Sequence, residues 1–162
     1  IAADFSQFAN IGTTHVEPFD LHEVLGSLRD LYRTDPQVNL VWYPVSESLP
    51  LLADKTQMNR LFTNLLTNAV QACSESGACR IVIDEKISDR KVLVSVQDNG
   101  EGIPTEMQDK IFVPNFTTKS SGTGLGLAMC KGIVEQAQGK IWFETKQGEG
   151  TKFFVELPLV EV

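Results

Sequence analysis

The segment RIVIDEKISDRKVLVSVQDNGEGIP, residues 80–104, carries the clearest indication of the fold class. Its residues 80–87 and 92–97 alternate between apolar and polar around a polar tripeptide, which predicts a β-hairpin. A glycine-rich loop, residues 98–104, follows the second strand. Asp98 therefore stands at a strand end, beside glycines that let a ligand approach the backbone. An ordinary β-turn is the alternative interpretation, because Asp, Asn and Gly are common turn residues.

Helical patterns flank this segment on both sides. Asp20 and Asp54 can each cap a helix, and the apolar spacing after Asp54 continues to about Cys73, the strongest helical pattern in the chain. The other predicted elements are a strand at 38–43, a loop at 44–50, a helix at 125–138 and a last hairpin of residues 140–145 and 151–157. This order predicts an α/β fold, a two-layer sandwich in which helices cover one face of a sheet.

The composition disfavours several classes of function. The 162 residues carry 14 Lys and Arg against 21 Asp and Glu, a net charge of −7, which disfavours nucleic-acid binding and a basic membrane-surface helix. No apolar run approaches the roughly 20 residues that cross a bilayer, and the first ten residues lack the pattern of a signal peptide. The cysteines, Cys73, Cys79 and Cys130, include no C-x-x-C pair. We therefore predict a reducing cytoplasm and cysteines that act as small apolar residues, with a Cys73–Cys79 bridge as the less favoured alternative.

Asn64 and Asn68 stand one helical turn apart on the long helix, so their side chains share one face. Gln57, Arg60 and Gln71 continue this polar stripe. A solvated helix face is one explanation, yet asparagine is a mediocre helix former. An amide oxygen is a suitable ligand for Mg²⁺, and an amide NH₂ can donate a hydrogen bond to a phosphate.

A second glycine-rich segment, SGTGLGL at 121–127, leads into the last predicted helix. Backbone amides at a helix start can bind anionic oxygens, and Lys119 lies just upstream. The segment matches neither the dinucleotide-binding pattern nor the P-loop pattern. Considered alone, it is equally consistent with a flexible hinge.

In combination and in this order, four motifs resemble the ATP-binding domain of sensor histidine kinases, in the superfamily of gyrase, MutL and the large heat-shock chaperone. The motifs are NRLFTNLLTNA (59–69) for the N box, DNGEGIP (98–104) for the G1 box, IFVPNFTTK (111–119) for the F box and GTGLGLA (122–128) for the G2 box. The lid sequence and the Gln71-Ala72 ending are similar to the nitrogen-regulation branch of these kinases. The resemblance covers residues 20–158 and implies the Bergerat fold, with three helices over a mixed sheet.

The resemblance also implies roles for individual residues. Asp98 accepts a hydrogen bond from the adenine amino group with support from Gly102, Asn68 is the Mg²⁺ ligand, and Asn64 and Lys119 are the catalytic candidates. Asn64 occupies the position of a glutamate that activates water in hydrolysing members, and an amide cannot act as that base, so phosphoryl transfer is favoured over hydrolysis. Residues 114–123 form the lid over ATP. The predicted nucleotide-binding set is Asn64, Asn68, Asp98, Gly100, Gly102, Ile103, Phe112, Phe116, Thr117, Thr118, Lys119, Gly122, Thr123, Gly124, Leu125, Gly126 and Leu127.

Two departures from the family pattern matter. Gln71 and Ala72 stand where many members have a Lys-Tyr pair, so a phosphate contact from that lysine is absent. Neither His15, in a linker, nor His22, in a helix of the nucleotide domain, suits the role of phosphoacceptor. The resemblance therefore places that histidine on a helical hairpin upstream of the first residue, and residues 4–9 resemble the end of that hairpin.

The sequence thus predicts two parts, a hairpin end with linker at residues 1–16 and an ATP-binding catalytic domain at residues 17–162. The predicted function is transfer of the γ-phosphoryl group to a histidine on a separate domain, with ATP and Mg²⁺ as cofactors. The predicted partners are the phosphoacceptor domain of the same kinase and a response regulator, with no nucleic acid and no direct membrane contact. We expect a cytoplasmic homodimer for the whole protein, with membrane anchoring left open. A gyrase-like or chaperone-like ATPase and a non-catalytic nucleotide-binding scaffold are the alternatives.

Overall fold

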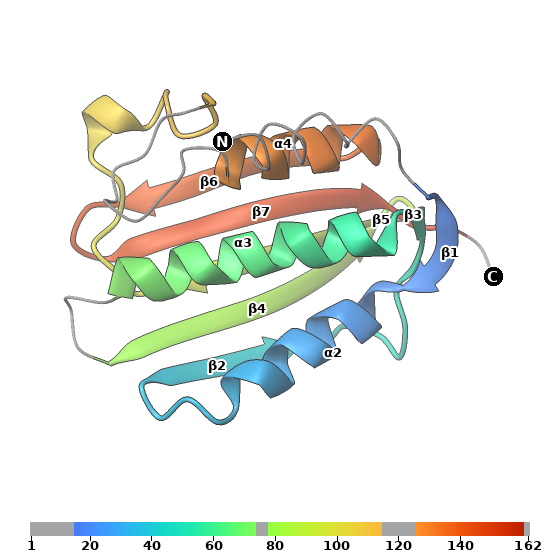
Figure 1. The fold of residues 1–162 in the computed structure, drawn as a ribbon, viewed down its shortest axis with the longest axis horizontal. Coiled ribbons are helices and arrows are strands. Elements are labelled where there is room, and N and C mark those ends of the chain that lie inside the picture. Colours follow the sequence, from blue (N-terminus) through green and yellow to red (C-terminus); the bar gives the residue numbers. More distant parts are fainter. Residues whose placement is uncertain (1–14, 74–77, 115–125, 161–162) are drawn as a thin grey trace, which may run out of the picture.

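A five-stranded sheet with helices against one face is the centre of the fold (Figure 1). The computed structural model describes residues 15–73, 78–114 and 126–160. Within these residues the strand order is β2-β4-β5-β7-β6, and β2 pairs with β4 in parallel while the other neighbours are antiparallel. The predicted two-layer α/β sandwich with a mixed sheet is confirmed.

The helices and strands have the following bounds. The strands are β1 (Glu17–Asp20), β2 (Val38–Tyr43), β3 (Pro50–Ala53), β4 (Cys79–Ser88), β5 (Lys91–Asp98), β6 (Lys140–Lys146) and β7 (Gly150–Pro158). The helices are α2 (Leu21–Tyr32), α3 (Lys55–Cys73), the 3₁₀ turn η2 (Thr105–Met107) and α4 (Gly126–Gln136). Among the described residues, no helix is both long and apolar enough to cross a membrane.

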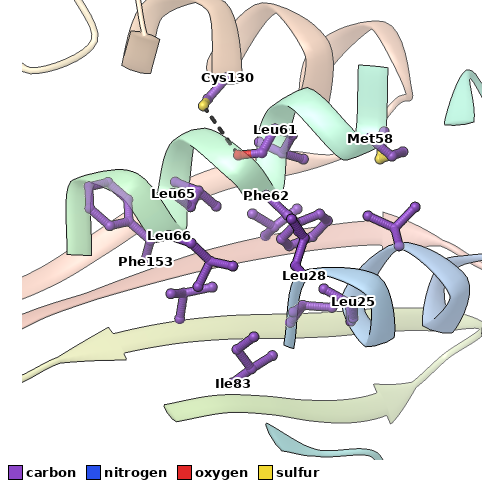
Figure 2. Close-up of a cluster of buried hydrophobic side chains, with 14 of the residues drawn as sticks. Leu25, Leu28, Met58, Leu61, Phe62, Leu65, Leu66, Ile83, Cys130 and Phe153 are labelled. Carbon is purple, nitrogen blue, oxygen red and sulfur yellow. Dashed lines mark hydrogen bonds between the residues drawn. The ribbon is translucent and has the colours of Figure 1, made fainter. Parts of the chain in front are cut away.

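Helix α3 crosses the middle of the sheet and organises the core (Figure 1). Asp54 caps it, because its Oδ1 accepts a hydrogen bond from the Gln57 backbone N–H at 3.2 Å. The apolar face of the helix, which includes Phe62, Leu65 and Leu66, is buried against the sheet (Figure 2). The polar positions of α3 are thereby directed away from the sheet, toward α4 and the loops.

Three local expectations were wrong. Residues 17–20 and 50–53 form a separate two-stranded antiparallel sheet, so the predicted loop ends before Pro50. Both strands are short and contain a proline, and their partners lie far apart in sequence, so periodicity gave no signal. Gln57 is buried at 7% exposure instead of solvated, and it lines a small cavity together with Leu52 and Ile133 of α4.

The third correction concerns the cysteines. The structure joins Cys73, at the end of α3, to Cys79, at the start of β4, by a disulfide. The sheet and helix bring their Cα atoms to 5.2 Å, which is within the usual range for a bridge. Cys130 fits the prediction of a small buried residue, and its thiol lies 3.7 Å from the Leu61 carbonyl oxygen (Figure 2).

Candidate functional site

Asp98 is a buried carboxylate at the end of β5. Alternate residues of this strand, Val92, Val94 and Val96, are buried, and Asp98 continues the same register at 6% exposure. Its Oδ1 accepts hydrogen bonds from the backbone N–H groups of Gly100 at 2.9 Å and Thr151 at 3.3 Å. The strand thus presents one carboxylate, fixed by backbone donors, on the helix-covered side of the sheet.

The loop after Asp98 lies directly against the end of α3. Glu101 N–H donates to the Ala72 carbonyl oxygen at 3.3 Å. A Cβ atom at Gly100 would lie 2.5 Å from the same carbonyl oxygen, so no larger residue fits there without displacing backbone. Glycine at position 100 therefore lets the loop approach the helix that carries Asn64 and Asn68.

The β6–β7 hairpin holds the other side of this loop. Gly148 N–H donates to the Glu101 carbonyl oxygen at 2.7 Å, and Ile103 N–H donates to the Thr145 hydroxyl oxygen at 2.9 Å. Gly102 has a φ of +79°, and a Cβ atom there would lie 2.6 Å from the Lys146 carbonyl oxygen. The loop is consequently fixed between α3 and the hairpin rather than being a simple exposed turn.

Thr145 and Thr151 belong to the site but were not in the predicted set. Their hydroxyl oxygens lie 2.8 Å apart, and Thr151 also donates its backbone N–H to Asp98. Thr151 is 5% exposed and shares the buried register of β7 with Phe153 and Val155. A polar residue at an inward-facing position of an apolar strand is the signal that could have identified it.

The start of α4 lies beside Asn64. A Cβ atom at Gly126, the first residue of α4, would lie 3.8 Å from Asn64 Oδ1. Asn68 follows one turn later on α3 and is half-buried, as is Leu127 on α4. Residues 98–103 therefore lie near the end of α3, and Gly126 lies beside Asn64 in the middle of the same helix.

Nine residues of the predicted nucleotide-binding set remain. The structure describes one of them, and the other eight lie outside the described part of the chain. Phe112 is half-buried, and its ring centroid lies 6.1 Å from that of Phe143 and 6.4 Å from that of Phe153. Its ring therefore packs against side chains of β6 and β7. The predicted lid, 114–123, falls almost wholly outside the described residues. The eight residues outside them are Phe116, Thr117, Thr118, Lys119, Gly122, Thr123, Gly124 and Leu125.

His22 is held in a separate cluster near the β2 edge of the sheet. Its Nε2 lies 2.9 Å from Oε1 of the buried Glu85, and its Nδ1 lies 3.2 Å from the Glu47 carbonyl oxygen. Glu85 also accepts from Trp42 Nε1 at 2.8 Å. Both ring nitrogens therefore lie within hydrogen-bond distance of protein oxygens, which is consistent with the prediction that His22 is not the phosphoacceptor.

Comparisons with known proteins agree with this geometry. The model of the family described as histidine kinase-, DNA gyrase B-, and HSP90-like ATPase matches residues 53–161. Sporulation kinase A of Bacillus subtilis (strain 168) is 34% identical over 145 residues, which are 88% of this chain and 24% of that protein. The chain thus spans about a quarter of the length of this relative.

Solved structures show the same relationship. The catalytic domain of histidine kinase ThkA superposes with a TM-score of 0.79 at 34% identity, over 90% of this chain and 97% of that one. The structure of ThkA in complex with the response regulator protein TrrA gives a TM-score of 0.75 at 27% identity, over 98% of this chain and 49% of that one. The family match and the near-complete overlap with a catalytic domain show that this chain belongs to the histidine kinase-, DNA gyrase B- and HSP90-like ATPases, as a catalytic domain of the histidine kinase type.

Proposed function

We propose that this chain binds ATP beside Asp98 and transfers its γ-phosphoryl group to a histidine on another domain of the same kinase. The observation that carries the proposal is the buried Asp98 carboxylate, fixed by the backbone N–H groups of Gly100 and Thr151. A carboxylate accepts hydrogen bonds and donates none. It is therefore suited to the amino group of adenine and unsuited to the carbonyl oxygen at the same position of guanine.

The phosphate end of the nucleotide is assigned to the opposite part of the site. Asn64 on α3 stands beside the start of α4, and Asn68 follows one turn later on α3. The backbone N–H groups of a helix N-terminus favour anionic oxygens. The predicted residues Lys119, Gly122 and Gly124 would add a cation and further amides to this end. Binding at both ends orients ATP along α3.

The residues present fit Mg²⁺ as a cofactor that arrives with the nucleotide. The described residues contain no group of three or more His, Cys, Asp or Glu that could hold a metal alone. Mg²⁺ commonly keeps several waters and binds through one or two protein oxygens plus substrate phosphates, and the Asn68 amide oxygen supplies such a ligand. Asn68 would hold the ion beside the phosphates, and the chemistry that Mg²⁺ would supply there is neutralisation of phosphate charge.

Transfer rather than hydrolysis follows from the chemistry of Asn64. An amide cannot accept a proton from water at neutral pH, so position 64 offers no general base. A nucleophile held in place by a docked domain removes much of the entropic barrier. The phosphoacceptor domain, a response regulator and a second copy in the whole protein are the partners that this function requires, and ThkA has been solved with a response regulator.

The same proposal assigns residues 1–16 to the end of a phosphoacceptor hairpin with its linker and residues 17–162 to the catalytic domain, and it places this domain in the cytoplasm. The relatives are several times longer than this chain, which leaves room for the hairpin.

The test is radiolabelled ATP incubated with this chain alone and with a helical hairpin that carries the phosphoacceptor histidine. We expect acid-labile label on the hairpin only in the mixture, and slow phosphate release without it. Brisk phosphate release by the chain alone would favour an ATPase. Tight ATP binding with neither label nor phosphate release would favour a scaffold.

A further inference from the structure

The Cys73–Cys79 bridge lies beneath the loop that carries Asp98. Asn99, the residue after Asp98, accepts at Oδ1 from Arg80 N–H at 2.9 Å and donates from Nδ2 to the Ala78 carbonyl oxygen at 3.2 Å. Its amide therefore binds the two residues on either side of Cys79. The same Oδ1 lies 3.3 Å from Cys73 Sγ, so one side chain contacts Cys73 and both chain neighbours of Cys79.

The helix end is tied to the same loop. Ala72, the residue before Cys73, accepts a hydrogen bond from Glu101 N–H at 3.3 Å and leaves room at Gly100 only for hydrogen. Movement of residues 72 and 73 relative to β4 must therefore move the loop of residues 98–101. This is the loop that positions the adenine-binding carboxylate.

We propose that Cys73 and Cys79 form a redox-sensitive pair that sets the affinity of the site for nucleotide. This inference rests on the proposed function and adds a form of regulation to it. The bridge fixes the end of α3 against β4 and so orders the loop before nucleotide arrives. Ordering a binding site in advance lowers the entropic cost of binding, so the oxidised form is expected to bind ATP more tightly than the dithiol form.

The two states also differ in their contacts. A Cys73 thiol has a proton that it can donate to Asn99 Oδ1, which already accepts from Arg80 N–H. The bridged sulfur has no proton and cannot make that bond. Oxidation thus exchanges a weak hydrogen bond for a covalent tether between α3 and β4.

The oxidant is a low-molecular-weight disulfide of the glutathione type. One cysteine thiolate attacks a sulfur of this disulfide, which forms a mixed disulfide and releases one small thiolate. The thiolate of the second cysteine then attacks the protein sulfur of the mixed disulfide and releases the second small thiolate. Two protein thiols are oxidised to one disulfide, one small disulfide is reduced to two thiols, and the two protons pass to the released thiolates.

The surroundings of the pair fit a reversible bridge. Ala78 and Arg80 are exposed on either side of Cys79, whereas the cysteines themselves are at most 5% exposed. The exchange therefore requires opening of the end of α3. Bound nucleotide holds that end closed, and by thermodynamic linkage it favours the bridge by the same factor as the bridge favours nucleotide.

The third cysteine, Cys130, serves as an internal control for thiol–disulfide exchange. Cys130 is fully buried in the core, and burial raises the pKa of its thiol to about 12. Since the thiolate is the reactive form in exchange, Cys130 is expected to stay reduced under the same conditions.

The experiment uses the 162-residue chain equilibrated in oxidised or reduced glutathione. Free thiols are counted by alkylation in denaturant and mass spectrometry, and affinity for a non-hydrolysable ATP analogue is measured by titration calorimetry. We expect one free thiol after oxidation and three after reduction, with the analogue bound about fivefold or more tightly by the oxidised form. Cys79→Val, which cannot bridge, should bind like the reduced form in both buffers, and Cys130→Ala should retain the difference.

Circular dichroism of each form checks that a change in affinity is not a loss of folding. Equal affinities of folded oxidised and reduced chain would overturn the inference, as would three free thiols in the oxidising buffer. Absence of nucleotide binding by both forms would instead overturn the proposed function.

Discussion

At the scale of single residues, alanine substitutions at two glycines of the site distinguish the effect of backbone strain from that of steric contact. Gly102 and Gly148 both have positive φ, +79° and +87°, but a Cβ atom at Gly102 meets the Lys146 carbonyl oxygen whereas one at Gly148 meets nothing within 4 Å. We expect Gly148→Ala to lower the free energy of unfolding by about 1 kcal/mol through strain. Gly102→Ala adds overpacking and should cost about 3 kcal/mol.

Urea denaturation of both variants measures these free energies. The Gly102 variant should also lose nucleotide affinity, because its loop carries Asp98. Equal destabilisation by the two substitutions would show that the loop is not held against the hairpin.

Asn68 provides a second test at this scale. Removing its amide oxygen in Asn68→Ala should weaken binding of the Mg²⁺ complex of an ATP analogue about tenfold, the equivalent of about 1.4 kcal/mol. The affinity for the analogue in the presence of a chelator should change much less. Thr67→Ala, at an exposed neighbouring position of α3, is the matched control. A loss that is the same with and without Mg²⁺ would remove Asn68 from the metal site.

The sequence placed Asp98 at a strand end beside two glycines, but this local pattern also fits an ordinary turn, so the role of Asp98 came from the family resemblance. The sequence alone was not sufficient to identify Thr145 and Thr151. Their importance comes from the register that pairs Gln97 with Lys152 and so brings Thr151 to Asp98, and register between strands distant in sequence is not encoded in local periodicity.

At the scale of elements, α3 both fills the core and carries the asparagines. Leu65 is 1% exposed, and it lies on the apolar face of the helix that carries Asn64 (Figure 2). Leu65→Ala should lower the free energy of unfolding by about 2 to 5 kcal/mol through lost burial and a cavity. Thr67→Ala on the same helix should change it by less than about 0.5 kcal/mol.

Thermal and urea denaturation distinguish these two variants. A Leu65 variant as stable as the Thr67 variant would mean that α3 is not packed on the sheet as described. Nucleotide affinity measured well below the melting temperature should fall only modestly, because Leu65 is buried in the core and the variant keeps both asparagines.

Elements with strong periodicity were predictable and those without it were not. The long apolar stripe gave α3 within a residue or two of its bounds, and the turn residues between β4 and β5 gave that hairpin. Gln57 was misassigned because a helical stripe shows which residues share a face but not which neighbour covers that face. Here the end of α4 and the first turns of α3 line one small cavity, and Gln57 is among its lining residues.

At the scale of the whole molecule, the sheet order is what brings the motifs together. Strand β4 pairs with β5 and strand β6 pairs with β7, each pair as a hairpin. Both hairpins were predicted from the alternating residues and the turn residues between the strands. The pairings of β2 with β4 and of β5 with β7 join distant segments and were not predicted, because the family resemblance implied only a mixed sheet. The β5–β7 pairing places the end of β5, and with it Asp98, between α3 and the β6–β7 hairpin.

Calorimetric titration of ATP and GTP analogues measures whether this assembly binds adenine nucleotides selectively at Asp98. A hydrogen bond to a charged group contributes about 1.5 to 3 kcal/mol. We therefore predict that the chain binds the ATP analogue at least about tenfold more tightly than the GTP analogue, and that Asp98→Asn removes most of this affinity while circular dichroism shows a folded protein. Equal binding of the two analogues, or full ATP affinity in folded Asp98→Asn, would contradict the account.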